Sequence, residues 1–496
     1  MPDEPGRAPS YEELAQLVVS QAEIINLQAE QIETLKGQLG DIEQLKSRIA
    51  ELERRLDQNS GNSGLSPSRD PAAERQRQAD ERAKRAAGSP KRSRGKQRGT
   101  KGRTVEMSAN PDEIVDHRPE RCGNCGKAFG HSDEGRYSAR QVVELPEVKP
   151  TTTEYRAHTF GCVCGHETTA AFPDNVRAPV SYGPRARAVV AYLLGRQHIP
   201  NRRVAEAMSE LFGLEISTGA VDSIYGEAGR RLKSFIAALV ALLRSLPVLH
   251  ADETSDRVST VNIWMHVVST GLYTLIHAST TRGAEAMEEA GVLKGYTGVV
   301  VHDRLAMYWK LKRAKHGLCA QHLLRDLADV AVVATQAAWA VGLAALLVEI
   351  NVACDEARRR GWRQLDLSTK RQFTKGYKEL VGMGLAANPE PKHRKRNPVE
   401  RRSYNLAVAF DTHRASILRY MNDLQVGWTN NQAERDLRPT KLHRKISGCF
   451  RSQAGAVRFA HLRSYLSTTR KHGISAMDAL VRLYEGNPWM PRDPGR

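Results

Sequence analysis

The sequence contains little cysteine and no long apolar run, and each shortage excludes a class of protein. Its 496 residues include seven cysteines, an odd number that does not suit a disulfide framework and favours a reduced, cytoplasmic protein. No apolar run approaches the ~18–20 residues that a membrane-spanning helix needs. The N-terminus, Met1-Pro2-Asp3-Glu4, lacks the charged and then apolar order of a secretory signal. We therefore expect neither a membrane protein nor a secreted one.

Positive charge is what the sequence has in excess. It holds 74 Lys and Arg residues against 56 Asp and Glu residues, which gives a formal net charge of +18. Such an excess in a soluble chain predicts a polyanionic partner, with nucleic acid as the first candidate. The length implies roughly three domains, and mixed α and β elements are expected along the chain.

Residues 11–57 have the pattern of a coiled coil. Steps of four and three residues from Leu14 to Leu56 pass through thirteen positions, nine of them apolar, and meet no proline. A helix packed on its own chain is the alternative, but no apolar helix is predicted beside it. The pattern therefore predicts a homo-oligomer that forms through this segment.

Residues 58–110 are expected to form a basic, disordered linker. Asn, Gly, Ser and Pro end the helical pattern, and residues 69–103 then carry thirteen Lys and Arg against four Asp and Glu, a net charge of +9. A segment so poor in apolar residues is suited to non-specific contacts with DNA phosphates. The alternative is a solvated linker that contacts nothing.

Four of the seven cysteines fall in two close pairs, which predict a zinc-binding module at 111–178. Thiolates on a tight turn can share one tetrahedral Zn²⁺, and short strands are expected at 140–146 and 151–155, as in a zinc ribbon. Because the second pair is spaced unusually tightly, His158 or His166 is an alternative ligand, and four unligated thiols are a further alternative. The predicted ligands are Cys122, Cys125, Cys162 and Cys164.

Residues 184–245 contain a candidate helix-turn-helix. A helix at about 201–212 is followed by Gly213 and by a second helix for which Ser217 is a plausible N-cap. Two short helices joined around a glycine can place the second helix in the major groove of DNA. Any helical hairpin has this pattern, but Arg202 and Arg203 favour DNA binding.

Two acidic residues follow β-rich runs in the next segment. An apolar run delivers Asp252 at the end of a strand, two further strands are expected at 263–269 and 272–278, and a helix is expected at about 284–290. A second β-rich run then ends at Asp303. If these strands are parallel neighbours, the two carboxylates lie side by side, and a divalent metal would relieve their repulsion.

Glu434 is the candidate for a third carboxylate. With Thr429 or Asn430 as the cap of a helix, Glu434 falls near its first turn, and two bound metals could then promote in-line attack on a phosphodiester. The alternative is a plain surface ion pair between Glu434 and Arg438. The residues expected to bind DNA phosphates beside it are Arg435, Arg438, Lys441, Arg444 and Lys445.

Glu434 follows Asp303 at a separation of 131 positions, longer than an ordinary connection, so we expect an all-helical insertion at 319–425. Its basic run at 391–396 either contacts DNA or is a solvated loop. Cys319 and His322 suggest a metal site, although the start of a buried helix is the favoured interpretation. A helical tail is expected at 451–496.

Three motifs stand around the candidate acids: His250-Ala251-Asp252-Glu253-Thr254, Asp303-x4-Tyr308 and Asn430-Asn431-x-Ala433-Glu434-Arg435-x2-Arg438-Pro439. Together with the Asn59-to-Ser68 element, the cysteine pairs and the helix-turn-helix, which occur in matching order, they resemble the insertion-sequence family 66 transposases of bacteria. Residues 304–307 depart from that resemblance, which leads one to expect a glycine and an aromatic residue there.

The resemblance implies a ribonuclease-H-like catalytic core, built from residues 246–318 and 426–450. It implies an Asp252, Asp303 and Glu434 triad that uses Mg²⁺ or Mn²⁺ to cleave the ends of a mobile element and to join them to target DNA. Small accessory proteins of the same element are further implied partners. A non-catalytic, transposase-derived DNA-binding regulator and a nuclease without strand transfer are the alternatives.

Overall fold

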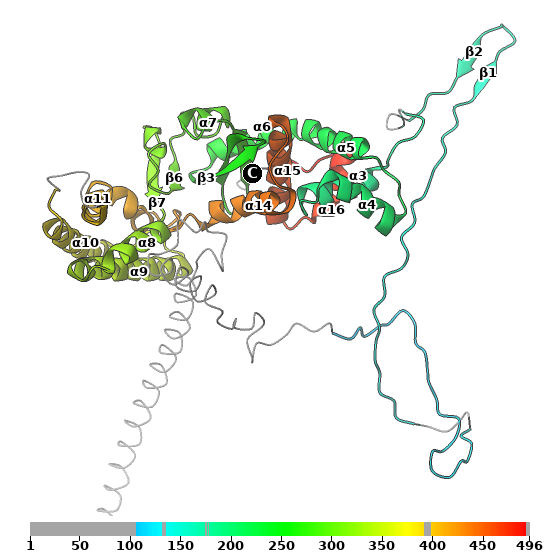
Figure 1. The fold of residues 1–496 in the computed structure, drawn as a ribbon, viewed down its shortest axis with the longest axis horizontal. Helices are drawn as coiled ribbons and strands as arrows, with labels where there is room; N and C mark the ends of the chain where they lie inside the picture. Colours follow the sequence, from blue (N-terminus) through cyan, green and yellow to red (C-terminus); the bar gives the residue numbers. More distant parts are fainter. Residues whose placement is uncertain (1–105, 131–134, 174–175, 177, 391–397, 493–496) are drawn as a thin grey trace, which may run out of the picture. The chain divides into compact units, whose positions relative to one another are not determined.

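The structure is a computed structural model that describes residues 106–130, 135–173, 176, 178–390 and 398–492 (Figure 1). The chain divides into two units, Met1–Ala83 and Lys84–Arg496, and every described residue belongs to the second. The predicted coiled coil, nearly all of the predicted basic linker, and the basic run at 391–396 lie outside the described residues.

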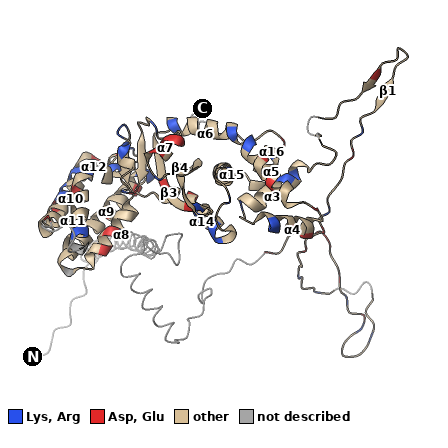
Figure 2. Cartoon of the chain, turned by 45° about the horizontal axis from the view of Figure 1, so that its top comes forward, with Lys and Arg blue, Asp and Glu red and all other residues tan. Residues whose placement is uncertain are grey.

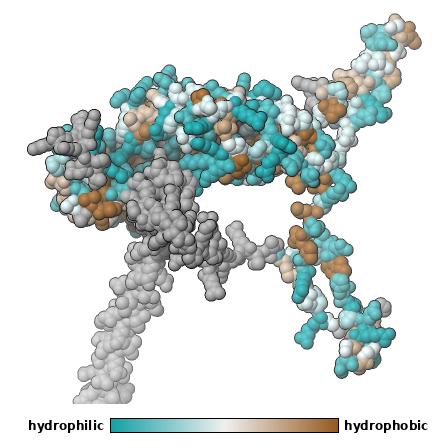
Figure 3. Space-filling model, in the orientation of Figure 1, coloured by the Kyte–Doolittle hydropathy of each residue, from teal (hydrophilic) through white to brown (hydrophobic). Residues whose placement is uncertain are grey.

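The described residues between 106 and 180 contain little regular structure. Their strands are β1 (Thr159–Gly161) and β2 (Glu167–Thr169), which pair antiparallel. The strands predicted at 140–146 and 151–155 are wrong, because both segments lack regular structure. The apolar side chains that suggested them are open to solvent, with Val142 92% and Leu145 85% exposed, so nothing here stabilises a sheet. Figure 3 shows apolar residues along this extended segment.

Four helices precede the main sheet, and several of their ends carry residues that commonly start or stop helices. Pro184 opens the first helix, where its missing N–H costs nothing. Gly213, with φ of 60°, ends the second, and the Ser217 hydroxyl caps the third by accepting the Ala220 N–H at 3.1 Å, which confirms the predicted cap. The helices are α3 (Pro184–Gly195), α4 (Asn201–Phe212), α5 (Thr218–Arg231) and α6 (Lys233–Ser245).

A five-stranded mixed sheet forms the centre of this part of the chain, with strand order β5-β4-β3-β6-β7. β3, β4 and β5 form an antiparallel meander, whereas β6 and β7 run parallel to β3. The expected order of three strands, a helix and a strand is confirmed, with α7 (Ala284–Glu289) as the helix. The strands are β3 (Val248–Val258), β4 (Val261–Ser269), β5 (Thr274–Ser279), β6 (Val299–His302) and β7 (Lys315–Leu318).

The two faces of the sheet pack against different helices. Leu249 and Ala251 of β3 belong to the apolar cluster that includes Phe235 and Leu239 of α6. Met265 and Val267 of β4 belong to a cluster with α14 (Asn431–Ser447) and α15 (Gln453–Lys471). Because successive side chains of a strand alternate between faces, β3 presents every second residue toward α14.

Between β7 and α14, the described residues form helices and no strand. The helices are α8 (Ala320–Ala331), α9 (Ala337–Arg359), α10 (Leu367–Ala387), α11 (Pro398–Thr412), α12 (Arg414–Ile417) and α13 (Arg419–Asn422). They share an apolar cluster with Val299 and Val301 of β6, so this helical region packs directly onto the parallel edge of the sheet.

Helix α9 is long enough and apolar enough to cross a membrane, judged by length and composition alone. Among the described helices it is the one with this property. The expectation that no apolar segment approaches such a length is therefore wrong for this helix. Core helices have the same composition, and Leu343, Leu347 and Ile350 of α9 are fully buried in the cluster of the helical region.

Helix α15 covers the free edge of β5 with hydroxyl groups. The Ser464 hydroxyl accepts the Ile276 N–H at 2.8 Å, and the Thr468 hydroxyl accepts the Thr274 N–H at 3.1 Å. An unpaired strand edge would otherwise expose these backbone groups. The segment predicted as a C-terminal tail is thus built into the sheet, and α16 (Ala476–Tyr484) then packs against α3.

A buried ion pair joins α14 to α15. Lys471 Nζ lies 2.7 Å from Asp436 Oδ2, and the two side chains are 8% and 1% exposed. Lys471 also donates to the carbonyls of Thr270 and Tyr273 in the β4–β5 turn. One ammonium group therefore links α15, the hairpin turn and α14.

We predict that Lys471→Met lowers the free energy of unfolding by about 3–5 kcal/mol, because it leaves the Asp436 carboxylate buried without its partner. Urea denaturation of the full chain measures the change. Lys294→Met, which removes an exposed ammonium, is the matched control and should change stability by less than about 1 kcal/mol. Equal effects of the two substitutions would show that the buried pair is not needed for stability.

Candidate functional site

The parallel pairing of β3 with β6 sets the relation between the two predicted catalytic aspartates. The register pairs Val248 with Val299 and His250 with Val301. Two residues further along the same register stand Asp252 and Asp303. Asp252 does not end its strand as predicted, since β3 continues to Val258 along β4. It lies instead just beyond the point where pairing with β6 stops.

Asp252 faces the side of the sheet that α14 covers. Its neighbour Ala251 points into the cluster on the α6 side, and His250 on the opposite face contacts Asn430, with His250 Nδ1 3.2 Å from Asn430 Oδ1. Alternation along β3 then directs Asp252 to the face of His250. Asp252 is 7% exposed, so its carboxylate is largely withdrawn from water.

Asn430 fastens the start of α14 to the strand that carries Asp252. Its Nδ2 donates to the Ala251 carbonyl at 2.7 Å, and its backbone N–H contacts Cys319 Sγ at 3.1 Å. Asn430 occupies the predicted N-cap position, but its side chain does not cap the helix. Cys319 in turn donates its N–H to the His302 carbonyl, next to Asp303. The start of α14 is therefore tied to the neighbours of both aspartates.

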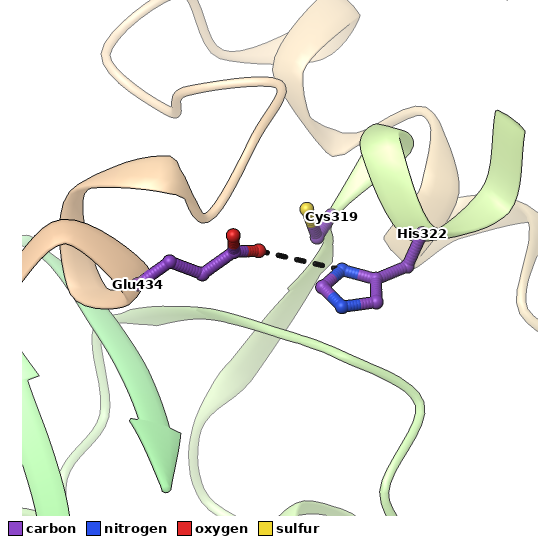
Figure 4. Close-up of side chains that lie close together, drawn as sticks. All are labelled: Cys319, His322 and Glu434. Atoms are coloured by element: carbon purple, nitrogen blue, oxygen red, sulfur yellow. Dashed lines mark ion pairs between the residues drawn. The ribbon is translucent and has the colours of Figure 1, made fainter. Parts of the chain in front are cut away.

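Glu434 lies in the first turn of α14, as predicted, and meets Cys319 and His322 (Figure 4). Glu434 Oε1 is 3.8 Å from His322 Nδ1. Among the described residues these three side chains form the one group of three metal-ligand types whose donor atoms lie within 4.8 Å of one another. The carboxylates of Asp252, Asp303 and Glu434 are not gathered that closely.

Cys319 is buried at the start of α8, in agreement with the favoured sequence interpretation. Burial, and next the charge of Glu434, raise the pKa of the Cys319 thiol to about 12. The sequence interpretation missed that Cys319 and His322 adjoin Glu434, because more than a hundred residues separate the two segments. No local pattern indicates such a contact.

Glu253 and Tyr308 form a buried pair beside the aspartates that the sequence interpretation did not single out. Tyr308 donates its hydroxyl to Glu253 Oε2 at 2.9 Å, and Arg282 Nη2 lies 2.8 Å from Glu253 Oε1. Burial, followed by the nearby charge of Asp303, raises the pKa of Glu253. Glu253 and Tyr308 both belong to the motifs that carry the family resemblance. That position in the motifs is the sequence signal that points to them.

The basic residues predicted on α14 point mostly to solvent. Arg435, Arg438, Arg444 and Lys445 are exposed, and Lys441 is partly buried. Figure 2 shows Lys and Arg residues along α14. The helix therefore combines a buried apolar side, an acidic first turn and an exposed basic side.

The two arginines predicted to bind DNA lie on the first helix of the candidate helix-turn-helix, whereas the arginines of the second helix lie in its last turn. Arg202 and Arg203 are exposed in the first turn of α4. In the first turns of α5, the exposed side chains are small or acidic, and Asp222 lies 3.2 Å from Arg458 of α15. The structure thus forms both predicted helices, but it gives the start of the second one no cation.

Each cysteine pair lies on a turn whose backbone N–H groups point at sulfur. Hydrogen bonds from the N–H groups of Cys125 and Asn124 lower the pKa of Cys122, and the N–H of Cys164 lowers that of Cys162. The turns are closed by the Gly126 N–H to the Cys122 carbonyl and the Gly165 N–H to the Cys162 carbonyl. The described structure does not bring the two pairs together as one group of ligands.

Comparison with known families places this geometry in context. Residues 9–106 match a family of unknown function (DUF6444), and a search of curated proteins gives no match. Residues 179–458, more than half of the 496-residue chain, match the family described as Transposase IS66 family. This match runs from just before α3 into α15 and includes all three predicted catalytic carboxylates. The chain therefore belongs to the IS66 family of transposases.

Proposed function

We propose that this protein is a DNA transposase whose catalytic residues are Asp252, Asp303 and Glu434. The observation that carries the proposal is the arrangement of the segments that bear these residues. Both aspartates follow the last β3–β6 pair by two residues, which favours neighbouring carboxylates, and Asn430 joins the start of the Glu434 helix to the backbone of β3. A mixed sheet in the order β5-β4-β3-β6-β7, with helices on both faces, supports a ribonuclease-H-like core.

The carboxylates suit a hard divalent cation, Mg²⁺ or Mn²⁺. Glu434 Oε1 is buried and makes no hydrogen bond among the described residues, so a positive charge there would satisfy it. Carboxylate oxygens are the preferred ligands of both ions. Bound metal would activate the attacking water or 3′-hydroxyl and stabilise the leaving oxygen of the phosphodiester. Asp252, Asp303 and Glu434 would hold it.

The surrounding residues hold these carboxylates in place. The Leu305 N–H donates to Asp303 Oδ1 at 2.8 Å and fixes its side chain, while the Glu253 N–H donates to Asp252 Oδ1 at 2.9 Å. Tyr308 and Arg282 each engage one carboxylate oxygen of the buried Glu253 and so fix its position. The site is therefore preorganised by hydrogen bonds from its own neighbours.

Other parts of the chain supply DNA binding and assembly in this proposal. The exposed cations of α14, together with Arg202 and Arg203, would contact phosphates of the element ends and the target. The +9 segment at 69–103 adds non-specific affinity. The coiled coil would join copies of the chain, and accessory proteins of the same element are proposed partners. The expected location is the bacterial cytoplasm, on the nucleoid.

We predict that Asp303→Asn abolishes cleavage while leaving DNA binding within about twofold of the wild type, because it removes a metal-binding charge and keeps the shape of the side chain. The assay incubates purified protein with element-end duplex and Mg²⁺ and scores nicking and joining. Asp411→Asn, an exposed change on α11, is the control. Equal cleavage by Asp303→Asn and wild type would contradict the assignment, and DNA binding without cleavage by the wild type would favour a regulator.

For the cysteine pairs, we propose one structural Zn²⁺ held by Cys122, Cys125, Cys162 and Cys164. Two N–H-lined turns with lowered thiol pKa values are suited to thiolate binding. This arrangement requires the two turns to come together around the metal.

We predict that the protein purified in reducing buffer contains about one equivalent of zinc, and that Cys122→Ser loses it. Elemental analysis measures the metal, and Co²⁺ substitution reports thiolate ligands by its charge-transfer absorption. Cys449→Ser, an exposed cysteine outside the pairs, is the control. Zinc retained in full by Cys122→Ser would contradict the assignment.

A further inference from the structure

We propose that Cys319, His322 and Glu434 form a binding site for Zn²⁺, and that Zn²⁺ bound there withdraws Glu434 from the catalytic metal. Binding of Zn²⁺ depends on these three side chains alone, whereas its inhibitory effect rests on the proposed function. The site is separate from the four cysteines of the candidate zinc module.

The ligands of this site stand where α8 and α14 begin. Cys319 is the N-cap residue of α8, and His322 follows it by three residues, a spacing that puts two side chains on the same side of a helix. Glu434 reaches toward them from the first turn of α14 (Figure 4). A sulfur, an imidazole and a carboxylate from two helices therefore meet at one place.

The donor atoms are close to the spacing that a tetrahedral Zn²⁺ requires. With bonds of about 2.0 Å to nitrogen or oxygen and about 2.3 Å to sulfur, the ligand atoms of such a metal lie roughly 3.3–3.6 Å apart. His322 Nδ1 and Glu434 Oε1 are 3.8 Å apart, and the donor atoms of all three residues lie within 4.8 Å of one another. Small side-chain movements are enough to close the set, and water can take the fourth position.

Backbone contacts hold the two helix starts at this spacing. The Asn430 N–H contacts Cys319 Sγ at 3.1 Å, and the Ala320 N–H donates to the Trp428 carbonyl at 2.8 Å. Cys319 is buried, while the side chains of His322 and Glu434 are 17% and 15% exposed, so an ion can reach these two from solvent. As the bond from Zn²⁺ to the Cys319 sulfur forms, the thiol proton is released to solvent.

The donor set favours zinc over magnesium. Sulfur and imidazole nitrogen suit Zn²⁺, whereas Mg²⁺ prefers an octahedron of oxygen ligands. The Asp252 and Asp303 carboxylates do not gather with Glu434 as closely as Cys319 and His322 do. Zn²⁺ at Cys319 and His322 would therefore hold Glu434 on the α8 side and compete with the catalytic metal for it.

The competing explanation is that these side chains only pack the start of α8. The Cys319 sulfur would then serve as an acceptor for Asn430, and His322 would make an ordinary ion pair with Glu434. His277 allows the two explanations to be separated, because its Nε2 lies 3.3 Å from Glu289 Oε2. The described structure gives that pair no third ligand residue. His277→Asn is therefore the matched control for His322→Asn.

The test measures Zn²⁺ bound by the full chain in reducing buffer, without DNA or Mg²⁺, by equilibrium dialysis and elemental analysis over a series of free Zn²⁺ concentrations. We expect the wild type and His277→Asn to bind one equivalent more than His322→Asn. Loss of an outer-shell partner already weakens a metal site 10- to 100-fold, so loss of a ligand should cost about 100-fold or more. Glu434→Gln keeps the shape of its side chain and should lose the same equivalent, which separates lost binding from misfolding.

Equal zinc binding by the wild type and His322→Asn overturns the site, and so does an equal loss from His277→Asn. A second assay adds Zn²⁺ to the wild type as it cleaves element-end duplex with Mg²⁺. Inhibition over the concentrations that fill the site supports the withdrawal of Glu434, and undiminished cleavage at full occupancy overturns it. A wild type that never cleaves DNA overturns the proposed function and the inhibition with it, while the dialysis measurement still decides the site.

Discussion

The contacts of one buried residue, Asn430, made by its side-chain amide and its backbone N–H, hold together the segments on which the candidate site depends. Asn430 bonds to the backbone of β3 beside Asp252 and to the thiol of Cys319, whose own N–H bonds to the backbone beside Asp303. These contacts are short and lie away from water, with Asn430 only 1% exposed. An unsatisfied buried polar group costs about 1–3 kcal/mol, so each contact restricts where α14 can begin. The position of Glu434 follows from that restriction.

Helix α15 and the edge strand β5 give α14 a second attachment to the sheet. The hydroxyl groups of α15 satisfy the edge of β5, and Lys471 joins α15 to Asp436, two residues after Glu434. α14 is thus held at its start by an amide and nearly two turns later by a buried ammonium. Its apolar residues Ala433 and Leu437 belong to the cluster that includes Met265 and Val267 of β4. The cations Arg435, Arg438, Arg444 and Lys445 are exposed and take no part in these contacts.

The parts that could be predicted from the sequence are those in which a local pattern and a long-range contact agree. β3 and β6 are apolar runs followed by acids, and Ser217 caps α5 by a contact three residues away. The strands predicted at 140–146 failed because alternating apolar residues form a strand only when a partner buries them, and Val142 and Leu145 have none. The contact of Glu434 with His322, and the hydroxyl groups of Ser464 and Thr468 on β5, join distant segments through polar side chains. Hydrophobic periodicity carries no information about such contacts.

The helical region inserted between the second aspartate and the glutamate is more than a spacer. Its apolar residues share a cluster with Val299 and Val301 of β6, the strand that leads to Asp303. Its first helix, α8, also carries His322, whose Nδ1 lies 3.8 Å from Glu434 Oε1. The inserted helices therefore contact the strand that precedes one proposed catalytic residue and the side chain of another, so their packing influences both sides of the candidate site.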